Sequence, residues 1–251
     1  MKKILLALCL LFSFESGFSQ IKPNEKLVYA ASYKMSGMMT QLAQVSMQTE
    51  TVNTSKKTYL HLSLEAVTFS KWDNFFKIRD LYESYVEPTT LKPSLYKRNI
   101  YEGGYTKSEK YVYKSDGRTI VCTTKKKNRP ETTKTITVGS SSQDVMSIVY
   151  KLRTVDFKSF KPGQIKSFII VFDQKEFPVS VKYMGKEKLS VANLGVKDCY
   201  KLSISAKTDV LKGKDKNLIW LTADAKKIPV QILFSIPVGT GLLKLAKASG
   251  I

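Results

Sequence analysis

The chain has 251 residues, of which 43% are hydrophobic and 25% are charged, and its formal net charge is +20. This length is sufficient for one sizeable hydrophobic core, and β proteins of such a size are often single domains. One histidine and three cysteines, with no CxxC or Cys-His spacing, exclude the usual zinc sites.

The first segment of the chain has the layout of a secretory signal peptide. Two lysines at positions 2 and 3 precede an apolar run of eleven residues, 4–14, which is too short to span a membrane. Gly17 and Ser19 supply small residues at the −3 and −1 positions of a cleavage site. We therefore predict cleavage before Gln20 and export to the periplasm or cell envelope of a Gram-negative-type bacterium.

Removal of residues 1–19 leaves one domain, residues 20–251, with a net charge of +19, because the segment holds two lysines and one glutamate. In a cytosolic protein this charge would suggest nucleic acid as the partner. An exported protein meets little nucleic acid, so we expect none. The alternatives are an anionic envelope surface, a glycan, an acidic protein, or a basic surface that serves only solubility.

Alternating apolar and polar residues dominate the mature chain and predict half-buried strands of an antiparallel sheet. Glycines separate these runs at the spacing of hairpins. The apolar members are Leu27, Tyr29, Ala31, Tyr33 and Met35; Ala43, Val45 and Met47; Leu60, Leu62, Leu64 and Ala66; Phe177, Val179, Val181 and Tyr183; Tyr200, Leu202, Ile204 and Ala206; and Ile228, Val230, Ile232, Phe234 and Ile236.

Two stretches have helical spacing instead. The first, residues 70–77, begins with a capping-box pattern at Ser70-Lys71-Trp72-Asp73 and places Trp72, Phe75 and Phe76 on one side. The second, residues 142–153, carries an apolar stripe with i, i+3, i+4 and i+7 spacing. Its members are Val145, Ile148, Val149 and Leu152.

Between the first helix and the middle of the chain, the sequence predicts a hairpin. Arg79 and Asp80 begin one strand, Pro88 and Pro93 bound a turn, and the return strand ends at Gly103-Gly104. Tyrosines, lysines and an arginine give this hairpin a basic, aromatic character.

The residues of common catalytic sites are scarce. His61 is the only histidine, and it alternates with leucines on the polar side of a strand. No GxSxG, HExxH or P-loop motif occurs, and no GxGxxG follows a strand. Paired carboxylates are the one catalytic alternative. We therefore expect no enzymatic activity, no metal and no cofactor.

Cys122 and Cys199 are the two cysteines of the mature chain. An oxidising compartment permits a disulfide between them, whereas their apolar, strand-like surroundings suit two buried free thiols. The sequence leaves both alternatives open.

Several of these features together resemble a bacterial exported family known as domain of unknown function 3108. The features are Arg79-Asp80, Leu91-Lys92-Pro93, Glu102-Gly103-Gly104, Asp144 to Arg153, Asp198 to Lys201, and the ending with Trp220, Asp224, Pro229 and Gly239. The family is similar in fold to the lipoprotein-carrier half-barrels of the Gram-negative periplasm (LolA/LolB-like). In those proteins a curved sheet wraps helices around an apolar cavity that holds acyl chains.

The combined prediction is a mainly β protein: a strongly curved antiparallel sheet, or half-barrel, with two short helices packed on its concave side. The expected function is a binding or carrier module for a hydrophobic or amphiphilic ligand such as a lipid. The residues expected to line the pocket are Trp72, Phe75, Phe76, Met146, Val149 and Tyr150. Alternatively these side chains only fill the core. Two alternative functions are an envelope structural or assembly factor that acts through its basic surface, and an outer-membrane β-barrel.

Overall fold

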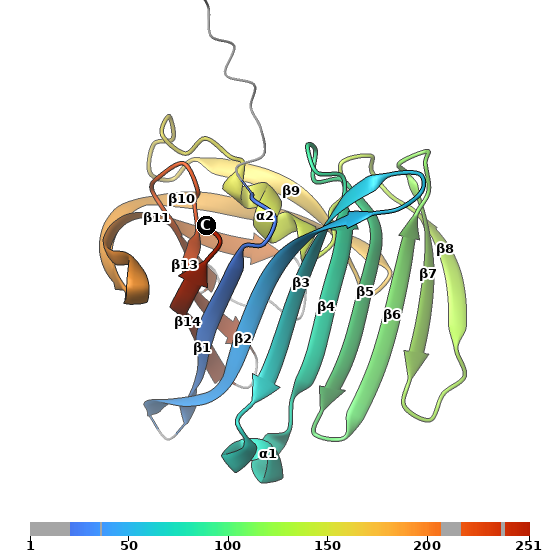
Figure 1. The fold of residues 1–251 in the computed structure, drawn as a ribbon, viewed down its shortest axis with the longest axis horizontal. Coiled ribbons are helices and arrows are strands. Elements are labelled where there is room, and N and C mark those ends of the chain that lie inside the picture. The colour runs from blue at the N-terminus through green and yellow to red at the C-terminus, as the bar shows by residue number, and fades with distance from the viewer. Residues whose placement is uncertain (1–20, 36, 207–216, 237–238) are drawn as a thin grey trace, which may run out of the picture.

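The computed structural model describes residues 21–35, 37–206, 217–236 and 239–251. The predicted signal peptide and its cleavage site lie outside these residues. All fourteen strands of the described residues belong to one antiparallel sheet, and two short α-helices lie beside it (Figure 1). The prediction of a mainly β protein built on a single antiparallel sheet is confirmed.

The strands follow one another as hairpins along the chain. Their bounds are β1 Lys26–Met35, β2 Met38–Asn53, β3 Thr58–Thr68, β4 Arg79–Val86, β5 Pro93–Glu102, β6 Tyr105–Tyr113, β7 Thr119–Lys126, β8 Thr132–Thr137, β9 Ile165–Phe172, β10 Lys175–Val191, β11 Gly195–Ala206, β12 Asn217–Thr222, β13 Pro229–Ile236 and β14 Gly239–Ser249. The helices are α1 Ser70–Phe76 and α2 Ser147–Arg153, and a 3-10 turn, η1, spans Ala192–Leu194.

The first and last strands pair with each other, so the sheet order is β8 through β1, then β14 down to β9. The two edge strands, β8 and β9, are not paired with each other. An isolated parallel bridge between Gln143 and Ile170 instead attaches the segment after β8 to β9. The sheet is therefore open between its first and last positions.

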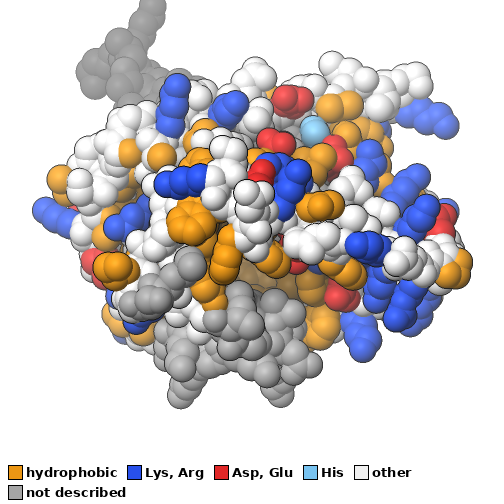
Figure 2. Space-filling view, turned by 90° about the horizontal axis from the view of Figure 1, so that it is seen from below, with side chains coloured by type: hydrophobic (Ala, Val, Ile, Leu, Met, Phe, Trp, Pro, Cys, Tyr) orange, Lys and Arg blue, Asp and Glu red, His pale blue; other side chains and the backbone are white. Residues whose placement is uncertain are grey.

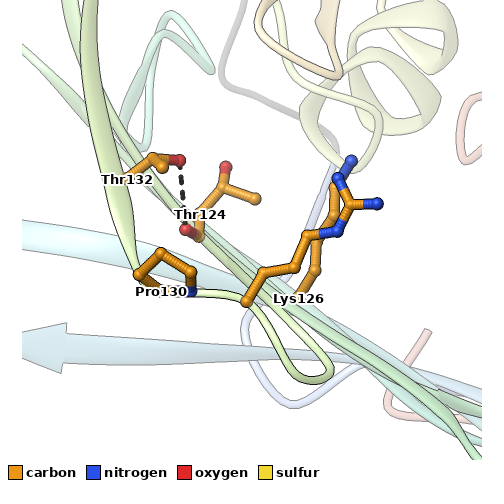
Figure 3. Close-up of a pocket in the computed structure, with 5 residues that line it drawn as sticks. Thr124, Lys126, Pro130 and Thr132 are labelled. Atoms are coloured by element: carbon orange, nitrogen blue, oxygen red, sulfur yellow. Dashed lines mark hydrogen bonds between the residues drawn. The ribbon is translucent and has the colours of Figure 1, made fainter.

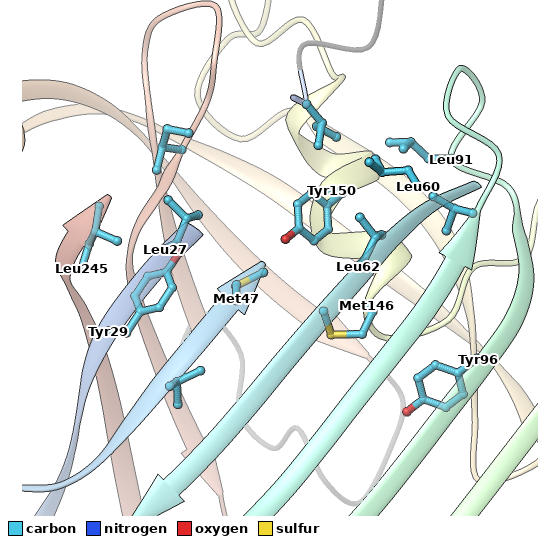
Figure 4. Packing of buried hydrophobic residues seen from close by; sticks show 14 of the residues in the cluster. Leu27, Tyr29, Met47, Leu60, Leu62, Leu91, Tyr96, Met146, Tyr150 and Leu245 are labelled. Carbon is cyan, nitrogen blue, oxygen red and sulfur yellow. The ribbon is translucent and has the colours of Figure 1, made fainter. Parts of the chain in front are cut away.

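The predicted alternation matches the register of the strands. Leu27 pairs with Met47, Met47 with Leu64, and Leu62 with Ser84, so these side chains share one face. We call this the inner face, because it packs against α2 in the hydrophobic core (Figure 4). The polar side chains that alternate with these residues, such as His61, lie on the outer face. There His61 Nε2 is 3.1 Å from Glu83 Oε1.

The two ends of the sheet meet through the turn between β9 and β10. Asp173 in this turn accepts hydrogen bonds of 2.5 Å from Arg98 on β5 and from Lys107 on β6. Since β5 and β10 are nine positions apart in the sheet, a flat sheet would separate them by about 40 Å. The contact thus brings the β9–β10 turn to β5 and β6.

The core consists of two clusters, and α2 contributes to both. Met146, just before the helix, and Tyr150 belong to a cluster with residues from both halves of the sheet, whereas Leu152 belongs to a second cluster with residues of β10–β13. The helix begins at Ser147 and not at residue 142 as predicted. The buried Asp144 carboxylate accepts hydrogen bonds from the backbone N–H groups of Met146 and Ser147, which holds the preceding segment in a turn.

A buried ion pair fixes the end of α2 to the start of β1. The Arg153 guanidinium donates two hydrogen bonds to the Glu25 carboxylate, at 2.6 and 2.8 Å, and both side chains are 2% exposed. Its Nε also donates to the Lys226 carbonyl in the turn between β12 and β13. Burial alone would lower the pKa of Arg153, but Glu25 outweighs it and holds that pKa above its ordinary value.

Helix α1 connects β3 to β4 and buries none of its side chains. The predicted capping box does not form, because Phe69 is the N-cap residue and no side chain caps the helix. The Asp73 carboxylate instead accepts hydrogen bonds from Thr68 and Arg79. The two helices therefore differ: α2 contributes buried side chains to the core, whereas α1 contributes none.

Cys122 and Cys199 are both buried free thiols. Burial raises the pKa of each thiol to about 11. Within the described ranges, no helix is long and apolar enough to cross a membrane.

Candidate functional site

The inner face is not filled evenly from one end of the strands to the other. On β1, Leu27 and Tyr29 are fully buried, whereas Ala31 and Tyr33 are only half-buried. The same change occurs along β3 between Leu62 and Leu64. We call the filled end, where α2 lies, the closed end, and the other end, where α1 lies, the open end (Figure 1).

Half-buried apolar side chains from both halves of the sheet continue the inner face toward the open end. Direct pairing places Ala31 beside Leu243, and Leu243 beside Ile232. We call the following set the apolar hollow: Ala31, Leu64, Ala66, Ile232, Phe234 and Leu243. Figure 2 views the molecule from this end and shows a hollow with hydrophobic side chains inside it.

Helix α1 is held at the edge of the open end by a few specific contacts. The Trp72 indole Nε1 donates a hydrogen bond of 3.2 Å to the Gln41 carbonyl on β2. The Phe76 ring lies against Gly103, whose φ is +54°, and an added Cβ there would be 2.7 Å from the ring. Phe75, by contrast, is 69% exposed. The helix thus presents an aromatic side chain to solvent next to the hollow.

Other turns at the open end also expose apolar side chains. Met38 and Met39 begin β2, and Tyr101 and Tyr105 flank the turn between β5 and β6. Met38 is 72% exposed, the largest fraction among the exposed large hydrophobic residues of the described chain. Exposed side chains of this size in one region are typical of a binding surface.

Positive charge gathers beside these apolar residues. Figure 2 shows Lys and Arg side chains grouped on the side of β5–β8. A pocket of about 240 Å³ lies at the turn between β7 and β8, where Lys126 and Arg129 line it together with Pro130 (Figure 3). Thr124 and Thr132 form its wall, and the Thr132 hydroxyl donates to the Thr124 carbonyl. Such a pocket is suited to an anionic group.

Deeper on the inner face, β5 and β6 carry a buried network of charged side chains. Glu109, which is 4% exposed, forms ion pairs with both Arg98 and Lys107, and Asp173 completes the cluster. Burial by itself would raise the pKa of Asp173, but Lys107 and Arg98 lower it below its ordinary value. The network neutralises its own charges and joins the β9–β10 turn to β5 and β6.

Asp80 is a neighbouring buried carboxyl on β4. Burial, together with the charge of Glu102, raises the pKa of Asp80 to about 7. Burial also raises the pKa of the nearby Tyr82 hydroxyl to about 12. The Asp80 carboxyl therefore changes between its protonated and ionised forms near neutral pH.

The structure separates the six predicted site residues into two groups. Met146, Val149 and Tyr150 lie together at the closed end, where Tyr150 is fully buried and Met146 is 2% exposed. Trp72, Phe75 and Phe76 lie together at the open end on α1. The two groups do not face each other across one pocket, because the length of β1–β4 lies between them (Figure 1).

Sequence analysis missed two features of the open end: its exposed methionines and the charged network of its inner face. It did not single out the exposed Met38-Met39 pair. The inner-face charges had a signal in the sequence, since Arg98 and Glu109 occupy the same alternating positions as the buried Tyr96 and Tyr111. In the part of the chain that the structure describes, no group of three or more His, Cys, Asp or Glu could hold a metal ion.

Comparisons with known proteins agree with this architecture. The model of the family described as "Protein of unknown function (DUF3108)" matches residues 28–246. None of the curated proteins matches the chain. A beta-barrel-like protein of domain of unknown function DUF1849 from Brucella abortus is similar in structure, with a TM-score of 0.59, 10% identity, and coverage of 90% of this chain and 97% of that chain. This similarity shows a related fold.

Two further solved structures match less closely. A protein from Parabacteroides distasonis, provisionally described as a lipoprotein, has a TM-score of 0.35 at 9% identity and covers 93% of this chain and 98% of its own. A protein from Bacteroides fragilis, provisionally described as exported and having a YmcC-like fold, has a TM-score of 0.31 at 7% identity, with coverage of 92% and 98%. At these TM-scores neither carries an argument about this chain.

Proposed function

This chain belongs to the DUF3108 family of proteins of unknown function, and for it we propose a non-catalytic role: binding an apolar or amphiphilic ligand of the cell envelope. The sheet acts as a half-barrel, and its concave side is the inner face. The ligand enters at the open end and lies in the apolar hollow. The closed end, filled by α2, forms the floor of the site.

The observation that carries this proposal is the loss of burial along the inner face. Leu62 is fully buried, whereas the next inner-face residues of β3, Leu64 and Ala66, are only half-buried. Leaving apolar surface in contact with water is unfavourable by about 25 cal/mol per Å². A ligand with an apolar part would cover this surface, and pockets of this kind usually combine apolar walls with a few polar groups.

The polar groups near the hollow suit the head of an amphiphile. The Asp80 carboxyl, with its pKa of about 7, and the half-buried Tyr82 hydroxyl lie on the inner face of the adjacent strand. Export, supported by the signal-peptide pattern of residues 1–19, would bring the protein to membranes that contain such molecules. No catalytic step is part of this proposal.

A fluorescent fatty-acid probe tests the proposal. The delipidated mature protein should bind the probe saturably with a micromolar Kd. Ala66→Trp should weaken binding at least tenfold, because its indole occupies the hollow. Val196→Trp is the matched control, since Val196 is an apolar residue that is 69% exposed on β11. It should leave binding unchanged.

Thermal melting followed by circular dichroism would show whether Ala66→Trp folds. Ala31→Met fills the same hollow with a smaller, flexible side chain and should give an intermediate loss. Absence of saturable binding to the wild-type protein would refute the proposal. Equal binding by the Ala66 and Val196 variants would place the ligand elsewhere.

A further inference from the structure

We propose that the open end of the first half of the sheet is a docking surface for an anionic lipid bilayer. The surface, which we call the basic rim, comprises the turns between β1 and β2, between β5 and β6, and between β7 and β8, together with α1. The register places all four at the same end of the strands: Ala43 pairs with Thr68, Ile78 bridges Glu102, and Lys107 pairs with Lys126.

Exposed apolar side chains are concentrated on the basic rim. Of nine exposed large hydrophobic residues in the described chain, six lie there: Met38, Met39, Phe75, Phe76, Tyr101 and Tyr105. The turns at the closed end of the same strands expose none of this set, and Leu91 in the β4–β5 turn is fully buried. Within β1–β8, the asymmetry indicates that the open end, and not the closed end, meets an apolar medium.

The charge of the basic rim selects the kind of membrane. Its segments, residues 34–39, 69–79, 101–106 and 125–131, contain eight Lys and Arg but only three Asp and Glu. One of those acids, Asp73, is already paired with Arg79 at 2.6 Å. Basic residues near an anionic leaflet each contribute about 1 kcal/mol, so this excess favours anionic over zwitterionic lipid.

Basic and aromatic side chains are interleaved on the basic rim. Lys71 Nζ lies 5.8 Å from the Trp72 ring, and Lys77 Nζ lies 5.7 Å from the Tyr101 ring. Long lysine stems can cover apolar surface while their ammonium groups reach lipid head groups, and aromatic side chains with a polar edge favour the membrane interface. The pocket formed by Lys126 and Arg129 beside them would hold a head-group phosphate.

The docking surface is independent of the apolar hollow, although both lie at the open end. Phe75 and Met38 are 69% and 72% exposed on the rim, whereas the hollow is lined by half-buried residues of the inner face. Docking would nevertheless place the mouth of the hollow against the bilayer. A ligand could then move between membrane and protein without crossing water.

Sedimentation with lipid vesicles tests the docking surface. The mature protein should bind vesicles of phosphatidylcholine mixed with phosphatidylglycerol, and should bind pure phosphatidylcholine vesicles at least tenfold more weakly. Raising the ionic strength from about 0.15 M to about 1 M shortens the Debye length from about 8 Å to about 3 Å and should release most of the bound protein.

Matched variants identify the residues involved. Phe75→Ser with Phe76→Ser should weaken vesicle binding at least tenfold. Ile165→Ser with Val196→Ser, at positions 56% and 69% exposed outside the basic rim, should not change it. Lys126→Gln with Arg129→Gln should weaken binding by roughly fivefold per residue. The control is Lys56→Gln with Lys57→Gln, which removes the same charge from exposed positions between β2 and β3 at the closed end.

Three outcomes would overturn the proposal: no binding to the mixed vesicles, equal losses in the rim and control variants, or a wild-type dimer that only the Phe75/Phe76 variant disrupts. The last result would assign the basic rim to a second copy of the chain. Probe binding by the Phe75/Phe76 variant separates this test from the previous one. If the ligand does not bind in the apolar hollow, probe binding is absent while vesicle binding is intact. If the basic rim does not dock on membranes, vesicle binding is absent while probe binding is intact.

Discussion

The closed and open ends of this sheet each contain an ionic cluster, and the two clusters differ in their access to water. At the closed end, Glu25 and Arg153 are both 2% exposed and hydrogen-bond to each other, and Arg153 also donates to the Lys226 carbonyl. At the open end, Arg98 is 4% exposed, but its partner Asp173 is 51% exposed. The Glu25–Arg153 pair is thus enclosed in the hydrophobic core, whereas the cluster of Arg98 and Asp173 is in contact with solvent.

This difference shows how one sheet can serve two purposes. The same strands, with the same alternation, supply both ends. At the closed end α2 and its ion pair fill the inner face and stabilise the fold. At the open end the inner-face residues are only half-buried, and the adjacent turns expose apolar side chains. Under the proposed function, stability and binding belong to opposite ends of the same strands, and substitutions at the two ends should have different effects.

The largest expected effect comes from breaking the ion pair at the closed end. Arg153→Met should lower the free energy of unfolding by about 3–5 kcal/mol, because it leaves the Glu25 carboxylate buried without its partner. Urea denaturation would measure the change. A second variant, Glu25→Gln combined with Arg153→Met, should recover part of the loss. If Arg153→Met has no effect, the closed end is not the stable half of the molecule.

A charge introduced on α2 should have the next largest effect. Val149→Asp should lower the free energy of unfolding by about 2–3 kcal/mol, because Val149 packs against the core and an aspartate there would lose hydration. Phe75→Asp on α1 is the control and should stay within about 0.5 kcal/mol of wild type, because Phe75 is 69% exposed. Equal melting curves for the two variants would contradict the distinction between the helices.

The protonation of Asp80 at the open end should make the stability of the protein depend on pH. The pKa of Asp80 is about 7 in the folded protein and near 4 when unfolded, so the folded state holds a proton that the unfolded state releases. Its contribution to stability is present at low pH and is lost as the pH rises through about 7. The melting temperature should therefore fall between about pH 5 and pH 7 and change little above pH 8, and Asp80→Asn should flatten this slope.

Asp173→Asn is the control for that measurement, because the pKa of Asp173 lies below its ordinary value and Asp173 stays ionised throughout this window. A slope that is unchanged in the Asp80 variant would show that another group controls it.

The smallest effect on stability is expected at the ionic cluster of the open end. Asp173→Asn should lower the free energy of unfolding by about 1 kcal/mol or less, because Asp173 is half exposed and Glu109 still pairs with Arg98 and Lys107. Urea denaturation beside Arg153→Met makes the comparison direct. A loss as large as that of Arg153→Met would show that the two clusters are equally enclosed.

The sequence by itself determined the local structure of this protein. Alternation at Leu60, Leu62 and Leu64 predicted a strand and its buried face, and the prolines at 88 and 93 marked the turn before β5. The apolar stripe around Val149 predicted the second helix. These predictions succeed because the period of side-chain direction is a local property of the backbone. The order of several short motifs also identified the family.

The tertiary structure decided where these elements lie. The pairing of β1 with β14, the contact of Asp173 with β5 and β6, and the Glu25–Arg153 pair join residues far apart in the chain. Periodicity shows which face of a strand or helix is buried but not what covers it. Trp72 and Tyr150 therefore looked like neighbours in one pocket, whereas the packing of the whole sheet placed them at its opposite ends.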